Sequence, residues 1–372
     1  MMTAFGKTIR KVRGHIRRPI RRLAQAPFAA ARAKALSDLL DRINQSQVHV
    51  RIIDREKLTT YSSIEGGNPW FLEFAATAPP VLQKQRSLHL LDSTWHNWHG
   101  ELTQLIKPIK QAKRLNPQAR FVVITHTPFC SYQLSRAGVQ NIYIQSSALE
   151  DEHSWVLSPP DPDLPRFDAI YNARLVDWKN HALARELESL LLVYDHPVSE
   201  EETLADFRRQ LPDACFANHD FAGGHYKNFG VQELSRFYGQ AKVSLALSQQ
   251  EGYMRASFQS LLTGTPIVSI PNIGGRNKFY HEDTALIVEP TAEAVAQGVR
   301  EMISRNLDPH FVRREALKLL QIERREFMET VNALRRVVFG RNVPEVDFEA
   351  FRGSKFAKVR VADFLAELSG CS

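Results

Sequence analysis

The stretch SQQEGYMRASFQSLLTGTPIVSIPNIGG, residues 248–275, decides the fold of this chain. It starts at the end of an apolar run, passes a Glu-Gly turn, keeps helical spacing up to Gly264, and enters a second apolar run at Pro266. We therefore expect strand, turn, helix and strand in succession. The turn sets the Glu251 carboxylate beside the free N–H groups of a helix N-terminus, an arrangement that favours hydroxyls and anions. Taken alone, Glu251 also fits an ordinary acid near a helix start, and Gly264 an ordinary helix stop.

Outward from this stretch, short β-branched runs alternate with helical stretches. In the second half we expect strands over 167–173, 189–195, 214–218, 243–248, 266–271 and 285–289, and helices over 179–188, 200–210, 231–240, 254–263, 291–304 and 310–339. In the first half we expect strands over 48–53, 87–91, 121–125 and 141–145, and a helix over 100–115. This alternation predicts an α/β fold of two Rossmann-like domains with parallel sheets that face a central cleft.

Composition bounds the class of protein and its compartment. The chain has 372 residues, of which 43% are hydrophobic and 24% charged, so it is long enough for about two globular domains. The three cysteines, Cys130, Cys215 and Cys371, lie far apart, which argues against a disulfide framework and a cysteine zinc site and favours a reducing compartment. No apolar run approaches the roughly 18 residues of a spanning helix, so we expect a soluble or peripheral protein.

The positive charge is concentrated at the N-terminus. Residues 1–40 hold ten Lys and Arg against one acid, a net charge of +9, whereas the rest holds 38 against 40, a net charge of −2. A nearly neutral body argues against a nucleic-acid partner. Apolar residues recur every three or four positions over residues 5–23 with arginines between them, which is typical of an amphipathic helix on an anionic membrane surface. A solvated arm and an organelle transit peptide are the alternatives.

Four prolines in residues 158–165 indicate a linker. The predicted organisation is a basic amphipathic arm, a reduced N-terminal Rossmann-like domain, a Pro-rich linker, a C-terminal Rossmann-like domain, and a tail that folds back on the first domain. Their ranges are 1–46, 47–157, 158–166, 167–342 and 343–372.

The motifs of the second half resemble those of the GT-B-fold retaining glycosyltransferases of the large family four type (glycosyl transferases group 1). Glu251-Gly252-Tyr253 and Gly264-Thr265-Pro266-Ile267-Val268 stand at the spacing of that family's Glu-Gly and Gly-Thr-Pro motifs. Arg174-Leu175, with Lys179 five residues after the arginine, follows a predicted strand as the family's Arg-Leu and Lys do, and Gly274-Gly275 is similar to its Gly-Gly loop. The resemblance covers about residues 167–304.

The resemblance implies roles for these positions. Arg174 and Lys179 would hold the diphosphate of a nucleotide-sugar donor, because two cations at a strand-to-helix turn can neutralise the charge of the leaving group. Glu251 would orient the transferred sugar, with Gly252 and Tyr253 beside it. Gly274 and Gly275 would let the backbone approach the nucleotide.

Three positions in the helix over 254–263 depart from the family pattern. Gln259 replaces the carboxylate that usually binds the donor ribose, and an amide still hydrogen-bonds two hydroxyls without charge assistance. Met254 replaces a glycine and Arg255 an apolar residue, so the donor-sugar pocket is expected to differ in shape.

The first domain offers candidate catalytic residues at two predicted strand ends. His126 follows 121–125 and matches a histidine often seen at that strand end in the family, and Asp92 follows 87–91. Either is also an ordinary hydrogen-bonded residue, but the carboxyl ends of parallel strands face the cleft. Gly66-Gly67 is a weak match to the family's acceptor-side turn, and His96 with His99 lacks a third ligand for a metal.

Together these features predict a hexosyltransferase-type enzyme that moves a sugar from a nucleotide-sugar donor to a glycan or lipid-linked acceptor, with retention, in cell-surface polysaccharide or lipopolysaccharide biosynthesis. No cofactor or metal is expected, because Asp161-Pro162-Asp163, which has the D-x-D form of metal-dependent glycosyltransferases, lies in the linker. The basic arm suggests a cytoplasmic protein, peripheral at the inner face of the membrane. The alternatives are a non-catalytic glycosyltransferase-like binding protein and a sugar-nucleotide epimerase, for which no acid and base pair is evident.

Overall fold

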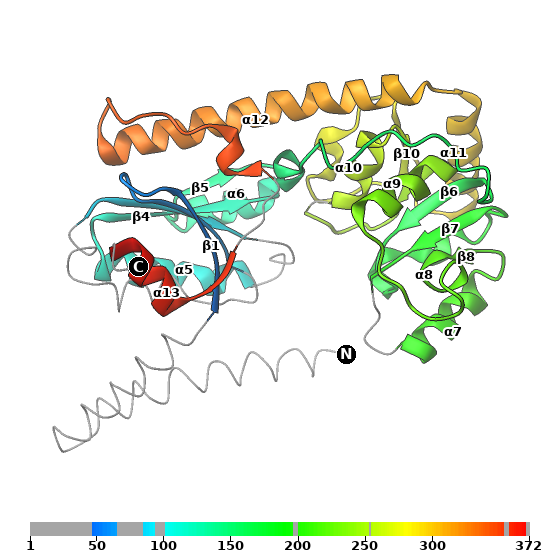
Figure 1. Ribbon diagram of the computed structural model, residues 1–372, viewed down its shortest axis with the longest axis horizontal. Helices are drawn as coiled ribbons and strands as arrows, with labels where there is room; N and C mark the ends of the chain where they lie inside the picture. The colour runs from blue at the N-terminus through cyan, green and yellow to red at the C-terminus, as the bar shows by residue number, and fades with distance from the viewer. Residues whose placement is uncertain are drawn as a thin grey trace, which may run out of the picture.

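The structure, a computed structural model, describes residues 47–64, 85–93, 101–195, 200–252, 254–352 and 357–369. It contains two six-stranded sheets with helices packed against each (Figure 1). This is the predicted α/β architecture of two Rossmann-like halves. The predicted basic arm, residues 1–46, lies outside the described residues, and the boundaries between the five predicted segments stay predictions.

The second sheet is parallel throughout, in the order β11-β10-β9-β6-β7-β8. Its inner strands are largely buried, because helices cover both faces and apolar side chains pack on each, whereas the edge strand β11 exposes Ile287. All six strands predicted here are confirmed: β6 (Phe167–Asn172), β7 (Leu190–Val193), β8 (Cys215–Phe216), β9 (Ala241–Ala246), β10 (Ile267–Ser269) and β11 (Ala285–Ile287). The predicted helices α7 (Glu200–Gln210), α9 (Val231–Gln240), α10 (Arg255–Leu262) and α11 (Ala292–Ser304) are also present, with a short α8 (Ala217–Asp220).

The helix predicted over 179–188 is wrong. Two 3-10 turns, η3 (Asp177–Lys179) and η4 (His181–Ala184), stand there instead. Asn180 separates them with a φ of 53°, a left-handed conformation that no α-helix of L-residues continues through. The connection from β6 to β7 is therefore compact and irregular, and it carries Lys179.

The first sheet has the order β12-β1-β2-β3-β4-β5. Its strands are β1 (Gln47–Asp54), β2 (Thr59–Ser63), β3 (Ser87–Asp92), β4 (Ala119–Thr125), β5 (Asn141–Tyr143) and β12 (Ala357–Arg360). β2 to β5 are parallel, but β1 is antiparallel to both β2 and β12, so the prediction of a parallel sheet is wrong at this edge. Residues 55–58 join β1 to β2, a connection too short for the crossover that parallel strands need.

Helices α5 (Glu101–Leu115) and α6 (Pro128–Arg136) belong to the first half, and η2 (Ser146–Leu149) follows β5. The tail returns to this half: β12 extends the sheet, and α13 (Val361–Ser369) places Phe364 in a core cluster with Val50 and Phe121.

Helix α12 (Pro309–Phe339) runs along both halves (Figure 1). It starts at the cap residue Asp308, whose carboxylate accepts from the His310 N–H at 3.0 Å, and it ends before Gly340 at a φ of 106°. Near its end Arg335, fully buried, pairs with Asp54 of β1. One long helix therefore ties the second sheet to the first.

Candidate functional site

Two loops diverge at the carboxyl edge of the second sheet. β6 and β9 are neighbours, but the chain leaves β6 toward β7 and leaves β9 toward β10, on opposite sides. A crevice forms outside the strand ends at such a switch point. The loop after β6 carries Arg174 and Lys179, and the loop after β9 carries Glu251. Sheet topology therefore brings three of the predicted site residues to one place.

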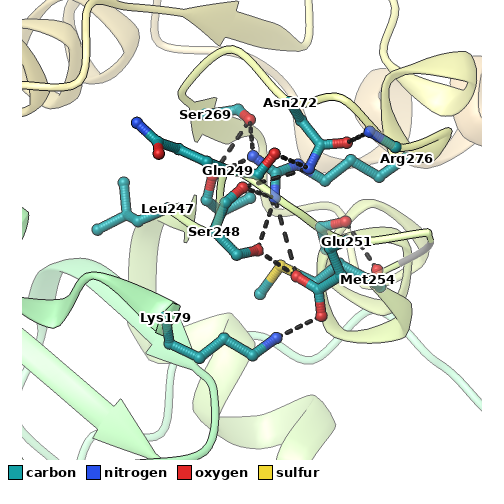
Figure 2. Close-up of polar contacts among 12 residues, drawn as sticks. Lys179, Leu247, Ser248, Gln249, Glu251, Met254, Ser269, Asn272 and Arg276 are labelled. Atoms are coloured by element: carbon teal, nitrogen blue, oxygen red, sulfur yellow. Dashed lines mark hydrogen bonds and ion pairs between the residues drawn. The ribbon is translucent and has the colours of Figure 1, made fainter. Parts of the chain in front are cut away.

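Lys179 and Glu251 form an ion pair in this crevice (Figure 2). The Lys179 Nζ donates to Oε1 of Glu251, and the two side chains are only 7% and 13% exposed. The side-chain amide of Asn180 also donates to the Leu247 carbonyl at 2.9 Å, and the Tyr171 hydroxyl donates to the Lys179 carbonyl at 2.6 Å. The loops that carry the pair are therefore pinned by backbone contacts as well.

The surroundings of Lys179 hold its pKa below the ordinary value of 10.5. Burial is the largest cause; Glu251 opposes it, and the like charges of Arg276 and Arg174 lower the pKa further. Among these four side chains three cations stand against one carboxylate, a net charge of +2. Such a crevice favours an anionic ligand, which would strengthen the protonated form of Lys179.

Arg174 lies at the exposed rim of the crevice. Its guanidinium is 3.4 Å from Oδ2 of Asp195, which follows β7, and the two side chains are 49% and 58% exposed. An exposed pair of this kind contributes little to stability, so a phosphate can replace the carboxylate at small cost. The position suits a cation that meets a ligand from solvent.

The paired glycines fit tightly against the protein itself. A Cβ on Gly274 would lie 1.5 Å from the Glu251 carbonyl oxygen, and one on Gly275 would lie 1.6 Å from Nε2 of Gln145. The Gly275 N–H also donates to the Gly252 carbonyl at 3.0 Å. Close packing against the protein itself therefore explains why glycine stands at both positions. The predicted approach of these glycines to a nucleotide stays a prediction. Tyr253 lies outside the described residues.

Gln259 donates to a carboxylate that sequence reasoning missed. Its Nε2 lies 3.3 Å from Oε1 of Glu150, which also accepts from Trp155 Nε1 at 2.9 Å and from two nitrogens of Arg255 at 2.9 and 3.2 Å. Glu150 lies just after η2 and is nearly buried. In this arrangement the Gln259 amide N–H is engaged within the protein. Met254, at the start of α10, is buried.

Asp92 and His126 lie side by side at the ends of the parallel strands β3 and β4. His126 Nε2 is 2.7 Å from Asp92 Oδ1, and its Nδ1 is 2.7 Å from the Ile144 carbonyl oxygen. Tyr61 donates its hydroxyl to the other oxygen of Asp92. Both ring nitrogens therefore face acceptors, so the imidazole is best satisfied as a cation. Burial lowers its pKa, but the charge and hydrogen bond of Asp92 and the hydrogen bond to the Ile144 carbonyl together outweigh burial and raise the pKa above 6.5.

One amide joins this pair of residues to the second half. Gln145 Nε2 donates to the His126 carbonyl at 2.9 Å and to the Gly252 carbonyl at 3.0 Å. The strand ends of the first sheet thus touch the Glu-Gly turn of the second. Gln145 was not predicted, because nothing in its local sequence marks a contact with a residue more than 100 positions away.

A cavity of about 380 Å³ lies beside the crevice. Its lining includes Asp177 and Asn180, which flank Lys179, and Gln249 near Glu251. His181 also lines it, and burial followed by the charge of Lys179 lowers the pKa of its imidazole to about 3. The cavity wall therefore carries a neutral imidazole at physiological pH.

Within the described residues, no three or more His, Cys, Asp or Glu side chains are grouped so as to hold a metal ion. Gly66, Gly67, His96 and His99 lie outside that part of the chain. Asp161 of the D-x-D sequence pairs with Arg236 of α9. The absence of a metal requirement stays a prediction. No helix in the described ranges has the length and apolarity to cross a bilayer.

The architecture matches solved structures at low sequence identity. HepE from Anabaena in complex with UDP superposes with a TM-score of 0.54 at 13% identity, over 81% of this chain and 82% of that one. The chain has the GT-B fold. Sucrose-phosphate synthase from Thermosynechococcus elongatus aligns with a TM-score of 0.48 at 18% identity over 70% of each chain. A glycosyltransferase from Rickettsia africae aligns with a TM-score of 0.46 at 14% identity, over 77% of this chain and 98% of that one.

No family model matches the sequence, and no curated protein sequence matches it. The likeness to known proteins is therefore one of fold. In this GT-B chain the Lys179–Glu251 crevice opens from the second sheet, and Gln145 of the first half reaches its Glu-Gly turn.

Proposed function

We propose that this GT-B protein is a glycosyltransferase that moves a sugar from a nucleotide-sugar donor to a hydroxyl of a glycan or lipid-linked acceptor, with retention of anomeric configuration. The observation that carries the proposal is the buried Lys179–Glu251 pair with Arg174 at its rim, at the switch point of the second sheet. The GT-B fold supports it, as does the resemblance to family four motifs of the segments that carry all three residues.

The proposed mechanism needs no protein nucleophile. Arg174 and Lys179 bind the donor diphosphate and neutralise the charge that develops as it leaves. Glu251 then accepts hydrogen bonds from hydroxyls of the sugar and holds it for attack from the front face. The departing diphosphate takes the acceptor proton. No metal or cofactor takes part in this proposal.

Asp92 and His126 are the proposed residues of the acceptor side. Their ion pair is buried, and Gln145 links the His126 backbone to the Glu-Gly turn. Because both imidazole nitrogens are engaged, we assign the pair to shaping the acceptor face rather than to removing a proton.

The acceptor is proposed to be a surface-polysaccharide or lipopolysaccharide precursor at the cytoplasmic face of a membrane. The support is the basic amphipathic pattern of residues 5–23, which suits an anionic bilayer. Flotation with vesicles containing phosphatidylglycerol, compared with neutral vesicles, tests this part: the full chain should float with the anionic vesicles and a chain that starts at residue 47 should not.

The test of donor binding is a thermal-shift screen against UDP, GDP, ADP, CMP and their sugar conjugates. A nucleotide at a hundredfold excess over its Kd stabilises the native state by about 2.7 kcal/mol, which is readily visible. We expect one nucleotide to stabilise the wild type and to lose its effect in Arg174→Ala. The matched control is Arg209→Ala on α7, whose exposed side chain pairs with Asp206 and should leave the effect intact.

The second candidate is a glycosyltransferase-like protein without catalysis. It is favoured by Gln259, which stands in place of the ribose-binding carboxylate and is engaged with Glu150. A well-folded wild type that no nucleotide stabilises would reject donor binding and leave this candidate. Nucleotide binding without hydrolysis or transfer of any bound sugar would also favour it.

A further inference from the structure

Arg276 is a buried cation at the floor of the crevice. It directly follows Gly275 in η5 (Arg276–Phe279), and its side chain is 1% exposed. Figure 2 shows the Arg276 side chain directed toward Ser248 and Ser269. Its nitrogens donate to five acceptors: the Ala246, Ser248 and Ile270 carbonyls and the Ser248 and Ser269 hydroxyls, at 2.6 to 3.1 Å.

These five acceptors are neutral, so they engage Nη1 and Nη2 of Arg276 but do not balance its charge, and its Nε is buried without a hydrogen-bond partner. A buried charge is costly unless an opposite charge lies near it. That charge is Glu251: Nη1 of Arg276 lies 3.8 Å from Oε2. The Ser248 hydroxyl donates to the same Oε2 and accepts from Nη1, so it links the two charged groups.

The two oxygens of Glu251 therefore face two cations of different mobility. Oε1 meets the ammonium of Lys179, which sits at the end of a flexible side chain. Oε2 meets Ser248 and Arg276, whose planar guanidinium is fixed by hydrogen bonds to the ends of β9 and β10. One partner of the carboxylate can leave while the other holds it in place.

We propose that Arg276 is a positioning residue that serves as the permanent counter-ion of Glu251, so that Lys179 can transfer from Glu251 to the donor diphosphate while the carboxylate stays in position for the sugar. This inference rests on the proposed function. Burial and the charges of Arg276 and Arg174 lower the pKa of Lys179 against the pull of Glu251. A second anion, such as a diphosphate, would therefore stabilise its protonated form.

Charge arithmetic separates this role from a structural one. Arg174, Lys179 and Arg276 against Glu251 carry +2 in the wild type. Arg276→Met lowers this net charge by one and leaves Glu251 to hold Lys179 alone. Arg276→Met combined with Glu251→Gln restores the wild-type net charge and removes the competitor for Lys179. If the guanidinium served only to join β9 to β10, its loss would weaken pyrophosphate binding equally in both variants.

The experiment is calorimetric titration of the full chain with inorganic pyrophosphate and with UDP. We expect Arg276→Met to weaken pyrophosphate binding about tenfold or more, and the double variant to return to within about threefold of the wild type. Glu251→Gln alone should bind pyrophosphate at least as tightly as the wild type. Arg276→Lys, which keeps the charge, should stay closer to the wild type than Arg276→Met.

The control is Arg335→Met, another fully buried arginine, which pairs with Asp54 of β1. It should lower the melting temperature and leave the pyrophosphate Kd of the folded protein unchanged. If Arg276→Met does not fold, the double variant and Ser248→Ala are measured in its place.

Ser248→Ala removes the hydroxyl that links Arg276 to Glu251. It should weaken UDP binding less than the triple variant Arg276→Met/Glu251→Gln/Lys179→Ala, which also removes the Lys179 contact to the diphosphate.

If the double variant binds pyrophosphate as weakly as Arg276→Met, this role is overturned and the proposed function still stands. Where Arg276→Met does not fold, the same conclusion follows if the double variant binds pyrophosphate more than about tenfold more weakly than the wild type. A folded wild type that binds neither pyrophosphate nor UDP would overturn both. Recovery in the double variant, with Arg335→Met unchanged, supports the counter-ion role.

Discussion

His126 stands between two acceptors, the Asp92 carboxylate and the Ile144 carbonyl, in a setting from which water is nearly excluded. The net effect of burial and of the Asp92 charge is a pKa raised above 6.5. The folded chain therefore keeps a proton that the unfolded chain releases above that pH. Stability from this pair is complete below pH 6.5 and is lost as the pH rises through the folded-state pKa.

Denaturant unfolding between pH 6 and pH 9 measures this linkage. We expect the free energy of unfolding to fall by up to about 1.4 kcal/mol per pH unit from this group. The neutral double variant His126→Gln/Asp92→Asn should lack that slope, and His153→Gln, at a histidine whose side chain is 75% exposed, should keep it. Equal slopes in the wild type and the double variant would contradict a charged His126.

At the same scale, the sequence predicted the place of some residues of the candidate site and missed others. Arg174, Lys179 and Glu251 stand in short motifs directly after predicted strands, so the sequence predicted their place at one sheet edge. Arg276 and Gln145 carry no such signal. Arg276 could have been suspected only from its place after Gly274-Gly275, because its partners come from two other segments, 246–251 and 269–270.

At the scale of elements, a seam formed by Gly275 and Gln145 joins the Gly-Gly loop to the end of β5. This seam depends on the absence of a side chain at Gly275. A Cβ on Gly275 would lie 1.6 Å from Gln145 Nε2 and 2.7 Å from the His126 carbonyl oxygen. The Gln145 side chain would have to leave, and the carbonyls of His126 and Gly252 would lose its hydrogen bonds. The glycine therefore permits the contact between the two halves.

We expect Gly275→Ala to destabilise the protein by about 1–3 kcal/mol, measured by urea unfolding. Gln145→Ala alone should cost less, and the double variant Gly275→Ala/Gln145→Ala should be clearly less destabilised than the sum of the two, because the clash and the lost bonds are shared. Strict additivity of the two single variants would show that the seam does not set the cost.

Elements with strong periodicity were predicted within a few residues. The helix predicted over 310–339 is α12, Pro309–Phe339. Its cap residue Asp308, its first residue Pro309 and the closing Gly340 are all local signals of helix ends. Two of the elements that failed lack such signals, whereas α6 was not predicted although Thr127 caps it and Pro128 opens it. β2, TTYSS, has little apolar content, and the helix over 179–188 is interrupted by Asn180.

At the scale of the whole molecule, the first sheet is completed by the end of the chain. β12 pairs with β1, and α13 buries Phe364 in the core cluster of the first half. Phe364 is 2% exposed. The tail is thus part of the structure that presents Asp92 and His126, although it lies more than 200 residues away in the sequence.

Phe364→Ala should reduce the free energy of unfolding by about 3–5 kcal/mol, the usual cost of emptying a core aromatic site. Asp363→Ala on the same helix is the matched control, since its exposed pair with Arg360 contributes little. Chemical denaturation of both variants checks the comparison. A small effect at Phe364 would mean that α13 contributes little to the first half.

The sequence by itself determined the α/β class, nearly all the strands and helices of the second half, and the motif residues at its sheet edge. Periodicity, capping residues and turns act between neighbours in the chain, so these features can be read locally. Only the tertiary structure decided the antiparallel edge of the first sheet, the seam through Gln145, the carboxylate of Glu150 and the buried charge of Arg276. Each depends on segments far apart in the chain that meet only when the sheets and helices pack, and no local preference specifies such a meeting.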